Sequence, residues 1–355
     1  MKPVAVIILN WNGAALLRRY LPSVIANTNS TIADVIVADN GSTDESVKVL
    51  KEEFPEVKTL LFSENWGFAE GYNKCVAQTA YKYTVLLNSD VRTPEGWLEP
   101  LYEYMEAHSD VGAVQPKLLK DFGPDDPRQV FEYAGAAGGY IDKHGYPYCR
   151  GRIFGTVEED HGQYDGEVTD IFWATGACFM VRSEVYLKVG GLDKDFFAHM
   201  EEIDLCWRLL NAGYRNCYIP QSRVYHLGGG SLPQGNPRKT YLNFRNNLLL
   251  LHKNLPANDA RRTLFIRRLY DTLAFFQSLA SLHFGDAKAI IRAHNHFRTM
   301  RKQYAQPATR NLLKAYPQGR RNIILEYYLH GHKTYPTLTT TPPPREGIKY
   351  LKKRR

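Results

Sequence analysis

The sequence has little of what marks disulfide-rich, zinc-binding or secreted proteins. Its five cysteines are odd in number and show no C-x-x-C spacing, which argues against a disulfide framework and against a zinc site. Met1-Lys2-Pro3 runs directly into an apolar, strand-like segment, so we expect no signal peptide. Together these absences predict a protein of a reducing, cytoplasmic compartment.

Acidic residues are scarce in the last third of the chain. Residues 240–355 hold 22 Lys and Arg but 5 Asp and Glu, a net charge of +17, and the total of +8 leaves −9 on residues 1–239. Such segregation indicates an anionic partner, either nucleic acid or a membrane surface. The basic block has neither zinc-finger spacing nor an aromatic RNA-binding motif, so we favour an anionic membrane and expect no nucleic acid. A solvated helical surface is the alternative.

The chain also lacks an apolar run long enough to cross a bilayer. Its best candidate, residues 264–284, is interrupted by Arg267, Arg268 and Asp271, and the uncharged part is shorter than the ~20 residues that a spanning helix needs. Within a helical pattern over 261–303, two interpretations stay open: an amphipathic helix at the membrane interface, or an ordinary core-facing helix pair. The Thr/Pro-rich and then basic residues 337–355 are expected to form a flexible arm.

Apolar runs and helical patterns alternate through the first 107 residues. Strands are expected at 4–9, 34–38, 58–62 and 83–87. Helices are expected near 14–25, 69–80 and 94–107, and Ser42 and Glu45 have the spacing of a capping box before a further helix. The alternation predicts an α/β fold with a mostly parallel sheet. From 108 to 170 the pattern breaks, which is typical of a substrate-facing excursion, and strand character returns at 171–182.

Polar residues cluster directly after two of the expected strands and once more further along the chain. The clusters are Val37-Ala38-Asp39-Asn40-Gly41-Ser42, Leu86-Leu87-Asn88-Ser89-Asp90 and Met200-Glu201-Glu202-Ile203-Asp204. Open α/β sheets bind ligands at the carboxyl ends of their strands. A carboxylate at Asp39 can accept hydrogen bonds from a nucleotide, although an Asx-turn is a serious alternative.

In this order, the clusters resemble those of family 2 glycosyltransferases with the GT-A fold, in particular the rhamnosyltransferase-like bacterial group. The resemblance covers roughly residues 3–250. It is carried by Val6-Ile7-Ile8-Leu9-Asn10-Trp11-Asn12-Gly13, residues 37–44, Glu64-Asn65-Trp66-Gly67-Phe68-Ala69, Asn88-Ser89-Asp90, Thr175-Gly176-Ala177, residues 201–208 and His226-Leu227-Gly228-Gly229.

The resemblance implies a GT-A domain over 1–239, with a nucleotide-binding half over about 1–107 and an acceptor-side half over about 108–239. A helical basic extension over 240–336 and the tail 337–355 would follow. The implied activity is inverting transfer of a sugar from a nucleotide-sugar donor to a glycan or polyprenyl-linked acceptor in cell-surface polysaccharide synthesis. We expect the protein at the inner face of the cell membrane.

The resemblance also implies roles for individual residues. The donor-binding set is Asn10, Asn12, Asp39, Asn40, Gly67, Asn73, Asn88, Ser89, Thr175, Gly176 and Arg245. Asp90 and His226 are the implied ligands of a divalent metal, Mg²⁺ or Mn²⁺, since cations that bridge diphosphates take one or two protein carboxylates. Asn88 replaces the first acid of the family's Asp-x-Asp pattern, which weakens direct coordination of the metal.

Glu202 stands at the family position of the general base, and Glu201 is the alternative. One carboxylate suffices for an inverting displacement if it reaches the acceptor hydroxyl. Asp204 and Arg208, spaced i to i+4, are expected to form an ion pair within a helix.

Two rival functions are a glycoside hydrolase and a non-catalytic protein that binds nucleotide sugars or a membrane surface. A hydrolase needs no nucleotide-binding site, so it would give no function to Asp39 and the strand-end asparagines. Release of nucleoside diphosphate by the purified protein in the presence of an acceptor would distinguish a transferase from both.

Overall fold

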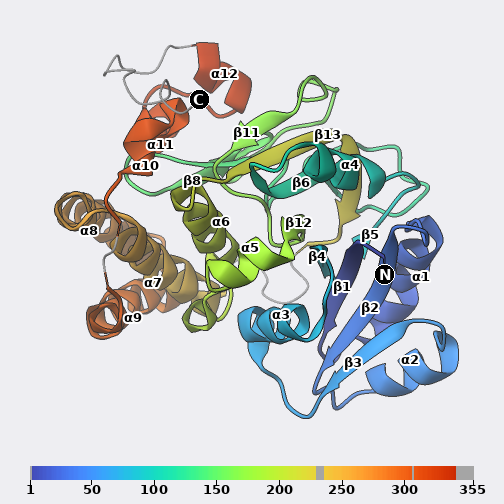
Figure 1. Cartoon of the computed structure of the whole chain (residues 1–355). Coiled ribbons are helices and arrows are strands. Elements are labelled where there is room, and N and C mark those ends of the chain that lie inside the picture. Colours follow the sequence, from blue (N-terminus) through green and yellow to red (C-terminus); the bar gives the residue numbers. More distant parts are fainter. Residues whose placement is uncertain (1, 229–235, 306–307, 341–355) are drawn as a thin grey trace. The chain divides into compact units, whose positions relative to one another are not determined.

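The computed structural model describes residues 2–228, 236–305 and 308–340, which form two compact units (Figure 1). The first unit comprises the described residues of 2–139, 150–152 and 157–228, and the second those of 140–149, 153–156 and from 236 onward. Residues 341–355 of the expected arm, and Gly229 of the family-like segment after His226, lie outside the described residues, and residues 337–340 are helical rather than a flexible arm. The domain boundaries at 239 and 336 stay a prediction.

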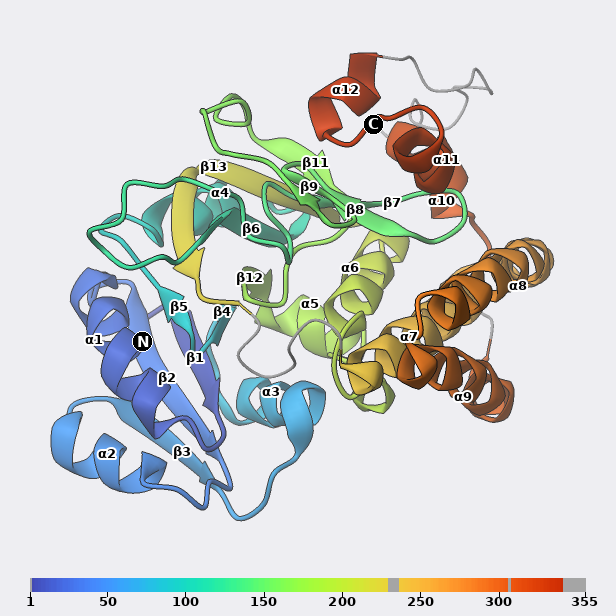
Figure 2. The same ribbon diagram turned by 180° about the vertical axis from the view of Figure 1, so that it is seen from behind.

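A nine-stranded mixed sheet forms the centre of the first unit (Figures 1 and 2). Its order is β11-β13-β6-β12-β4-β1-β2-β3, and β5 pairs with β13. The strands are β1 (Val4–Asn10), β2 (Ala33–Asn40), β3 (Lys58–Phe62), β4 (Tyr83–Asn88), β5 (Val91–Arg92), β6 (Val111–Lys120), β11 (Thr169–Ile171), β12 (Cys178–Arg182) and β13 (Arg215–His226). The neighbours β3, β2, β1 and β4 are parallel, and β12 runs antiparallel between β4 and β6.

Helices follow the parallel strands, as the alternation of apolar runs predicts. They are α1 (Ala14–Asn27), α2 (Ser46–Glu53), α3 (Gly67–Gln78), α4 (Glu99–Ala107), α5 (Ser183–Lys188) and α6 (Glu201–Asn211), with a 3₁₀ turn, η1, at Lys194–Phe196. Apolar side chains of β1, β2 and β4, such as Val6, Val37 and Val85, are fully buried in one core with α1 and α4. The predicted α/β class is confirmed.

The capping box predicted from Ser42 and Glu45 is wrong. α2 begins at Ser46, and the side chain of its N-cap residue, Glu45, forms no capping hydrogen bond with the described residues of the helix. Asp44 Oδ1 accepts a hydrogen bond from the Ser46 amide instead (2.9 Å), while Ser42 Oγ accepts one from the amide of Asn12, thirty residues earlier (2.9 Å). A partner from the neighbouring strand end has replaced the local cap.

The excursion expected over 108–170 is wrong for residues 111–120. These residues form β6, nine of whose ten residues are buried between β13 and β12. Pro116 and Lys117 obscure the strand in the sequence, and Lys117 is accommodated because its Nζ pairs with Asp160 (2.7 Å) and with Asp165. The short strands β7 (Gly139–Ile141), β8 (Pro147–Cys149), β9 (Arg152–Ile153) and β10 (Thr156–Val157) form a second sheet.

Helices dominate the second unit. α7 (Pro237–Asn254), α8 (Ala257–Ala280) and α9 (Phe284–Met300) pack against one another, as both ribbon views show (Figures 1 and 2). The shorter elements are η2 (Arg301–Gln303), α10 (Leu312–Ala315), η3 (Pro317–Arg320), α11 (Ile323–Tyr328) and α12 (Tyr335–Thr340). α8, α9 and η2 account for the helical pattern over 261–303. Within the described residues, no helix is both long and apolar enough to span a membrane.

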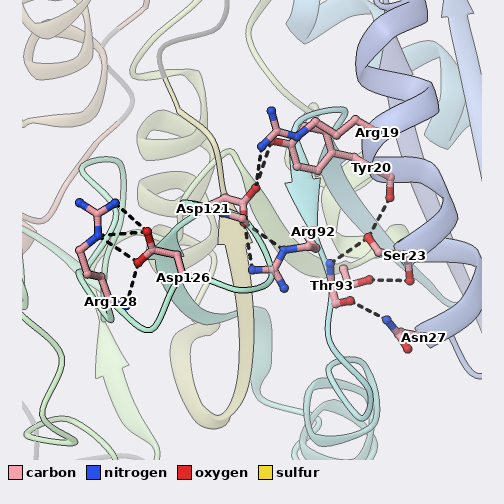
Figure 3. Close-up of polar contacts among 10 residues, drawn as sticks. Arg19, Tyr20, Ser23, Asn27, Arg92, Thr93, Asp121, Asp126 and Arg128 are labelled. Atoms are coloured by element: carbon pink, nitrogen blue, oxygen red, sulfur yellow. Dashed lines mark hydrogen bonds and ion pairs between the residues drawn. The ribbon is translucent and has the colours of Figure 1, made fainter.

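A buried carboxylate, Asp121, ties the end of β6 to α1 and β5 (Figure 3). Arg92 donates to Asp121 Oδ1 from Nε (3.0 Å), and Tyr20 Oη donates to Oδ2 (3.2 Å). Arg19 adds an ion pair at 3.5 Å. The Asp121 amide also donates to the carbonyl of His226 (2.9 Å). This cluster therefore fixes the end of β13, where the chain reaches His226.

We predict that Arg92→Ala lowers the free energy of unfolding by about 2 kcal/mol, because it leaves the buried Asp121 carboxylate with the more exposed Arg19 as its remaining cationic partner among the described residues. Urea denaturation measures the change. Arg128→Ala is the matched control, since its ion pair with Asp126 (2.7 Å, Figure 3) is largely exposed and exposed ion pairs contribute little to stability. Equal losses in the two variants would contradict this account of Asp121.

Candidate functional site

Strand register brings the polar strand ends of the first unit to one edge of the sheet. Asn10 of β1 is paired in register with Asp39 of β2, and Leu9 with Asn88 of β4. Asn10 Nδ2 donates to Asp39 Oδ2 (3.0 Å), and both side chains are buried. Asn10 Oδ1 is buried without a hydrogen-bond partner among the described residues. The edge thus offers a carboxylate and a free amide oxygen.

The turn after β1 packs against the turn after β2. Asn12 has a positive φ of 50°, and its Oδ1 accepts hydrogen bonds from the amides of Thr43 (2.7 Å) and Asp44 (3.3 Å). A Cβ atom on Gly13 would collide with Asn10 Oδ1. A glycine is therefore required at position 13, because the backbone passes close to the Asn10 side chain. The Asn12 side chain holds the turn after β1 against the turn after β2.

Two of the predicted donor-binding residues have their amide groups occupied by the protein. Asn40 accepts from the Trp66 amide and donates to Gly67 O and to Asn65 Oδ1, each at 3.0 Å. Asn73 donates to Leu192 O (2.8 Å) and accepts from the Leu192 amide (2.9 Å) and from Tyr186 Oη (2.6 Å). The structure places both residues as supports of loops at the ends of α3 and α5, and their role in donor binding stays a prediction.

The segment from Thr175 to Ala177 lies beside the end of β4. The Asn88 amide donates to Ala177 O (2.9 Å), and Thr175 Oγ1 donates to Ala134 O (2.6 Å). Asn88 and the following Ser89 are half-buried. A Cβ atom on Gly176 would lie 3.7 Å from the side chain of Glu202, so this segment connects the strand edge to the start of α6.

Asp90 and His226, 136 residues apart in the sequence, are in contact. Nε2 of His226 lies 3.1 Å from Oδ1 of Asp90, and Nδ1 lies 3.6 Å from Oε1 of Glu132, a residue that the sequence reading missed. Burial alone would lower the pKa of His226, but the hydrogen bond to Asp90 and the nearby carboxylate of Glu132 raise it to about 10. Burial likewise opposes ionisation of Asp90, but the hydrogen bond to His226 holds its pKa below the usual value.

These donors fit a hard or borderline divalent cation. Carboxylate oxygen and imidazole nitrogen are ligands that Mn²⁺ accepts, and carboxylate oxygen suits Mg²⁺. Buried Nδ1 of His226 has no hydrogen-bond partner among the described residues, and Glu132 is positioned to orient the ring. Gly228 has a φ of 69°, and a Cβ there would lie 2.7 Å from Glu132 Oε1.

Two adjacent carboxyl groups open α6. Glu201 is buried, and Oε2 of Glu201 and Oε2 of Glu202 lack hydrogen-bond partners among the described residues. Burial, and then the charge of Glu202, raise the pKa of Glu201 well above its usual value, and burial raises that of Glu202 to about 7. Such shifts are typical of functional carboxyl groups.

The loop before α6 has an uncommon backbone. Phe197, His199 and Met200 all have positive φ values, of 65°, 68° and 75°. Non-glycine residues in this region cost free energy and concentrate at functional sites. One turn into the helix, the predicted pair forms as expected: Arg208 Nε donates to Asp204 Oδ2 at 2.8 Å.

Arg245, predicted to contact a diphosphate, lies on α7 in the second unit. It is buried, and it donates from Nε to Asn246 Oδ1 (2.8 Å) and from Nη1 to Tyr241 Oη (3.4 Å). Its role toward the donor stays a prediction. Elsewhere in that unit, Glu326 lies beside His330 and His332, and accepts hydrogen bonds from both at 3.2 and 2.8 Å.

Comparison with known proteins assigns the family and the fold. The family described as "Glycosyl transferase family 2" matches residues 5–190. An N-acetylglucosaminyl-diphospho-decaprenol L-rhamnosyltransferase of Mycobacterium tuberculosis is 26% identical over 232 residues, 62% of this chain and 75% of the relative.

Two solved structures are similar in fold at 16% identity. GalNAc-T7 with UDP, GalNAc and Mn²⁺ superposes with a TM-score of 0.54 over 71% of this chain and 48% of its own. The mannosyltransferase PcManGT of Pyrobaculum calidifontis, in complex with GDP-Man and Mn²⁺, gives a TM-score of 0.50 over 82% of this chain and 86% of its own. The fold of this chain is the GT-A fold.

We predict that Glu201→Gln raises the free energy of unfolding at pH 7 by about 1 kcal/mol or more. The ordinary pKa of a glutamate is 4.5, and that of Glu201 in the folded protein is well above it. Between these two values the unfolded chain has lost the proton that the folded protein keeps, so wild-type stability falls as pH rises.

The gain from Glu201→Gln should therefore be large at pH 7 and shrink as the pH falls toward 4.5. Urea denaturation at a series of pH values measures it. Glu56→Gln, at an exposed position, is the control and should change little. A Glu201→Gln variant less stable than wild type at pH 7 would mean that its carboxylate has a stabilising partner.

Proposed function

Because this chain belongs to glycosyl transferase family 2, we propose that it transfers a sugar from a nucleotide-sugar donor, with inversion, to a glycan or polyprenyl-linked acceptor. The reaction would serve cell-surface polysaccharide synthesis at the cytoplasmic face of a membrane. The name of the mycobacterial relative, which acts on a decaprenol-linked sugar, supports a lipid-linked acceptor. Specificity for the donor's sugar and for its nucleotide base depends on loop contacts, which cannot be transferred from a relative by similarity alone.

The observation that carries the proposal is a continuous series of contacts within the first unit. Asn10 bonds to Asp39 at the strand edge, Asn88 follows in the neighbouring strand and bonds to Ala177, and Gly176 packs against Glu202. A donor bound at the strand edge would therefore have a carboxyl group of raised pKa nearby. A nucleotide cradle and a candidate base are what glycosyl transfer requires of the protein.

In this proposal Asp39 and the free Oδ1 of Asn10 accept hydrogen bonds from the base or ribose of the donor. The register of β1 and β2 holds the Asp39 carboxylate and the Asn10 amide in place, so these side chains lose little conformational entropy when the donor binds. Asn12, Asn40 and Asn73 act indirectly, because their amides hold the loops that frame the donor.

Asp90 and His226 would hold a divalent cation, Mg²⁺ or Mn²⁺, and Glu132 would orient the imidazole. Bound there, the cation would neutralise the negative charge that develops on the leaving diphosphate. His226 must give up its proton to become a ligand, since only the neutral ring offers a lone pair. Asn88 has no negative charge to contribute, so affinity for the metal would come mainly from Asp90 and the donor.

Glu202 fits the role of general base better than Glu201. A base works best when its pKa is close to the working pH, and the pKa of Glu202 is about 7. Glu201 is more deeply buried, and burial, followed by the charge of Glu202, raises its pKa well above the usual value. Glu202 would accept the proton of the acceptor hydroxyl as the new glycosidic bond forms and the diphosphate leaves from the opposite side.

We predict that Glu202→Gln retains donor binding but lowers turnover by about 10²-fold or more, the usual effect of losing a general base. Nucleoside diphosphate release in the presence of acceptor measures turnover, and calorimetry measures donor binding. Wild-type turnover should rise as pH increases through about 7 and level off above it, because the base must be deprotonated. A larger loss of turnover in Glu201→Gln would assign the base to Glu201.

We further predict that Asp90→Ala abolishes the metal dependence of donor binding, because it removes the carboxylate paired with His226. Calorimetric titration of donor with and without Mn²⁺ measures this dependence. Asn88→Asp should leave turnover intact or tighten metal affinity, since it adds a second carboxylate. Full metal-dependent turnover in Asp90→Ala would refute the proposed ligand.

A further inference from the structure

Helix α8 in the second unit has its polar and apolar faces reversed. Its buried residues are Ala260, Thr263, Arg267 and Asp271. Its exposed large residues, Phe265, Leu269, Leu273 and Phe276, are each between 55% and 65% exposed. The spacing of three and four residues places these four side chains along one face of the helix. A helix on a water-facing surface normally has the opposite arrangement.

Buried charges explain what holds α8 in this orientation. Arg267 pairs with Asp271 at 3.2 Å, and His294 of α9 lies 3.0 Å from the other oxygen of Asp271. The Arg267 guanidinium also lies over the ring of Tyr146, 3.8 Å from its centroid. Turning the apolar face inward would expel this network, and the orientation of α8 is therefore fixed by the fold.

The apolar face of α8 continues onto the start of α9. Leu282, Phe284 and Ile291 are all more than half exposed. Phe284 and Ile291 line an open cavity of about 460 Å³, together with Phe275 and Leu279 of α8. We call these exposed side chains, Phe265, Leu269, Leu273, Phe276, Leu282, Phe284 and Ile291, the apolar face. Contiguous exposed apolar surface of this kind marks an interaction site.

The charge around the apolar face is strongly positive. Residues 257–303 contain nine Lys and Arg and three Asp and Glu, and eight of the nine basic residues are exposed. All three acids are engaged: Asp259 by Lys314, Asp271 by Arg267 and His294, and Asp286 by Thr240. Arg261 and Arg268 stand four residues before and three after Phe265, next to it on the helix surface.

From this arrangement we infer that the apolar face inserts into the interfacial layer of an anionic lipid bilayer. Leucine and phenylalanine side chains would enter the boundary between headgroups and acyl chains, and the long basic side chains would reach the phosphates. A second copy of this chain fits less well, since a dimer through this face would bring the exposed basic residues of both copies together. The biological reason for such docking rests on the proposed lipid-linked acceptor. The exposed apolar residues and the basic residues around them are observed independently of that proposal.

Docking of this kind combines two forces that can be separated. Each basic residue near an anionic surface raises the partition coefficient about fivefold, and salt screens this contribution. Each inserted leucine or phenylalanine raises it about tenfold or more, and salt does not weaken this contribution. Insertion therefore predicts a salt-resistant part of the binding that depends on the apolar face.

The test is flotation of the full-length protein with vesicles of phosphatidylcholine, with and without about 30% phosphatidylglycerol. We expect binding to the anionic vesicles, weakening as salt rises from about 0.1 M to about 0.5 M. Leu269→Ser and Leu273→Ser should each lower the partition coefficient about tenfold. The matched control is Leu187→Ser, at an exposed position on α5, and should bind like wild type.

A labelling experiment distinguishes insertion from adsorption. All five native cysteines are buried, so a cysteine introduced by Leu273→Cys can carry an environment-sensitive dye, with Leu187→Cys as the control. Anionic vesicles should shift the emission of the dye to the blue only at residue 273. Vesicle binding without such a shift, binding unaffected by both serine variants, or a wild-type dimer that Leu273→Ser dissociates would each overturn the inference.

Vesicle binding is measured without donor, metal or acceptor, so its failure is separate from failure of the proposed chemistry. If insertion is correct, Leu273→Ser should also keep wild-type turnover on a short, water-soluble acceptor and lose it on the same sugar acceptor embedded in vesicles. Equal loss on both acceptors would show damage to the enzyme itself and contradict a role confined to docking.

Discussion

The parallel pairing of β1 with β2 and β4 is the constraint on which the candidate site depends. Parallel strands end at the same edge of a sheet, where the ladder of backbone hydrogen bonds stops and polar groups must find other partners. Asn10 and Asp39 satisfy each other there, and Asn12, Ser42 and Asp44 join the two turns. In the proposed function, a donor at this edge would meet groups that the sheet has already fixed.

Polar groups around this edge divide into two kinds. The side chains of Asn40, Asn73 and Thr175 form hydrogen bonds with groups of the surrounding loops and helices and hold the frame in place. Glu201 and Glu202, by contrast, follow a loop with three positive φ values, and Oε2 of each lacks a hydrogen-bond partner within the described part of the chain. Buried carboxyl groups without partners reduce stability, and proteins tolerate them chiefly where chemistry requires a shifted pKa.

The second unit uses buried charge for a different purpose. Arg267, Asp271 and His294 form a network that only the observed orientation of α8 can satisfy. Breaking such a network leaves an uncompensated charge, which is strongly unfavourable. The same network therefore keeps the apolar residues of α8 exposed.

Much of this could be predicted from the sequence, because local patterns determine it. The apolar runs of β1, β2 and β4, the polar residues at their ends and the Asp204–Arg208 pair depend on spacing alone. Tertiary structure decided the rest. Glu132 lies 94 residues before His226, and Asp121 takes partners from α1 and β5. β6 is a strand despite Pro116 and Lys117 because β12 and β13 enclose it. The sequence pattern predicted a helix here but not which residues of α8 are buried, since burial depends on Tyr146 and His294, which the fold brings to Arg267 and Asp271.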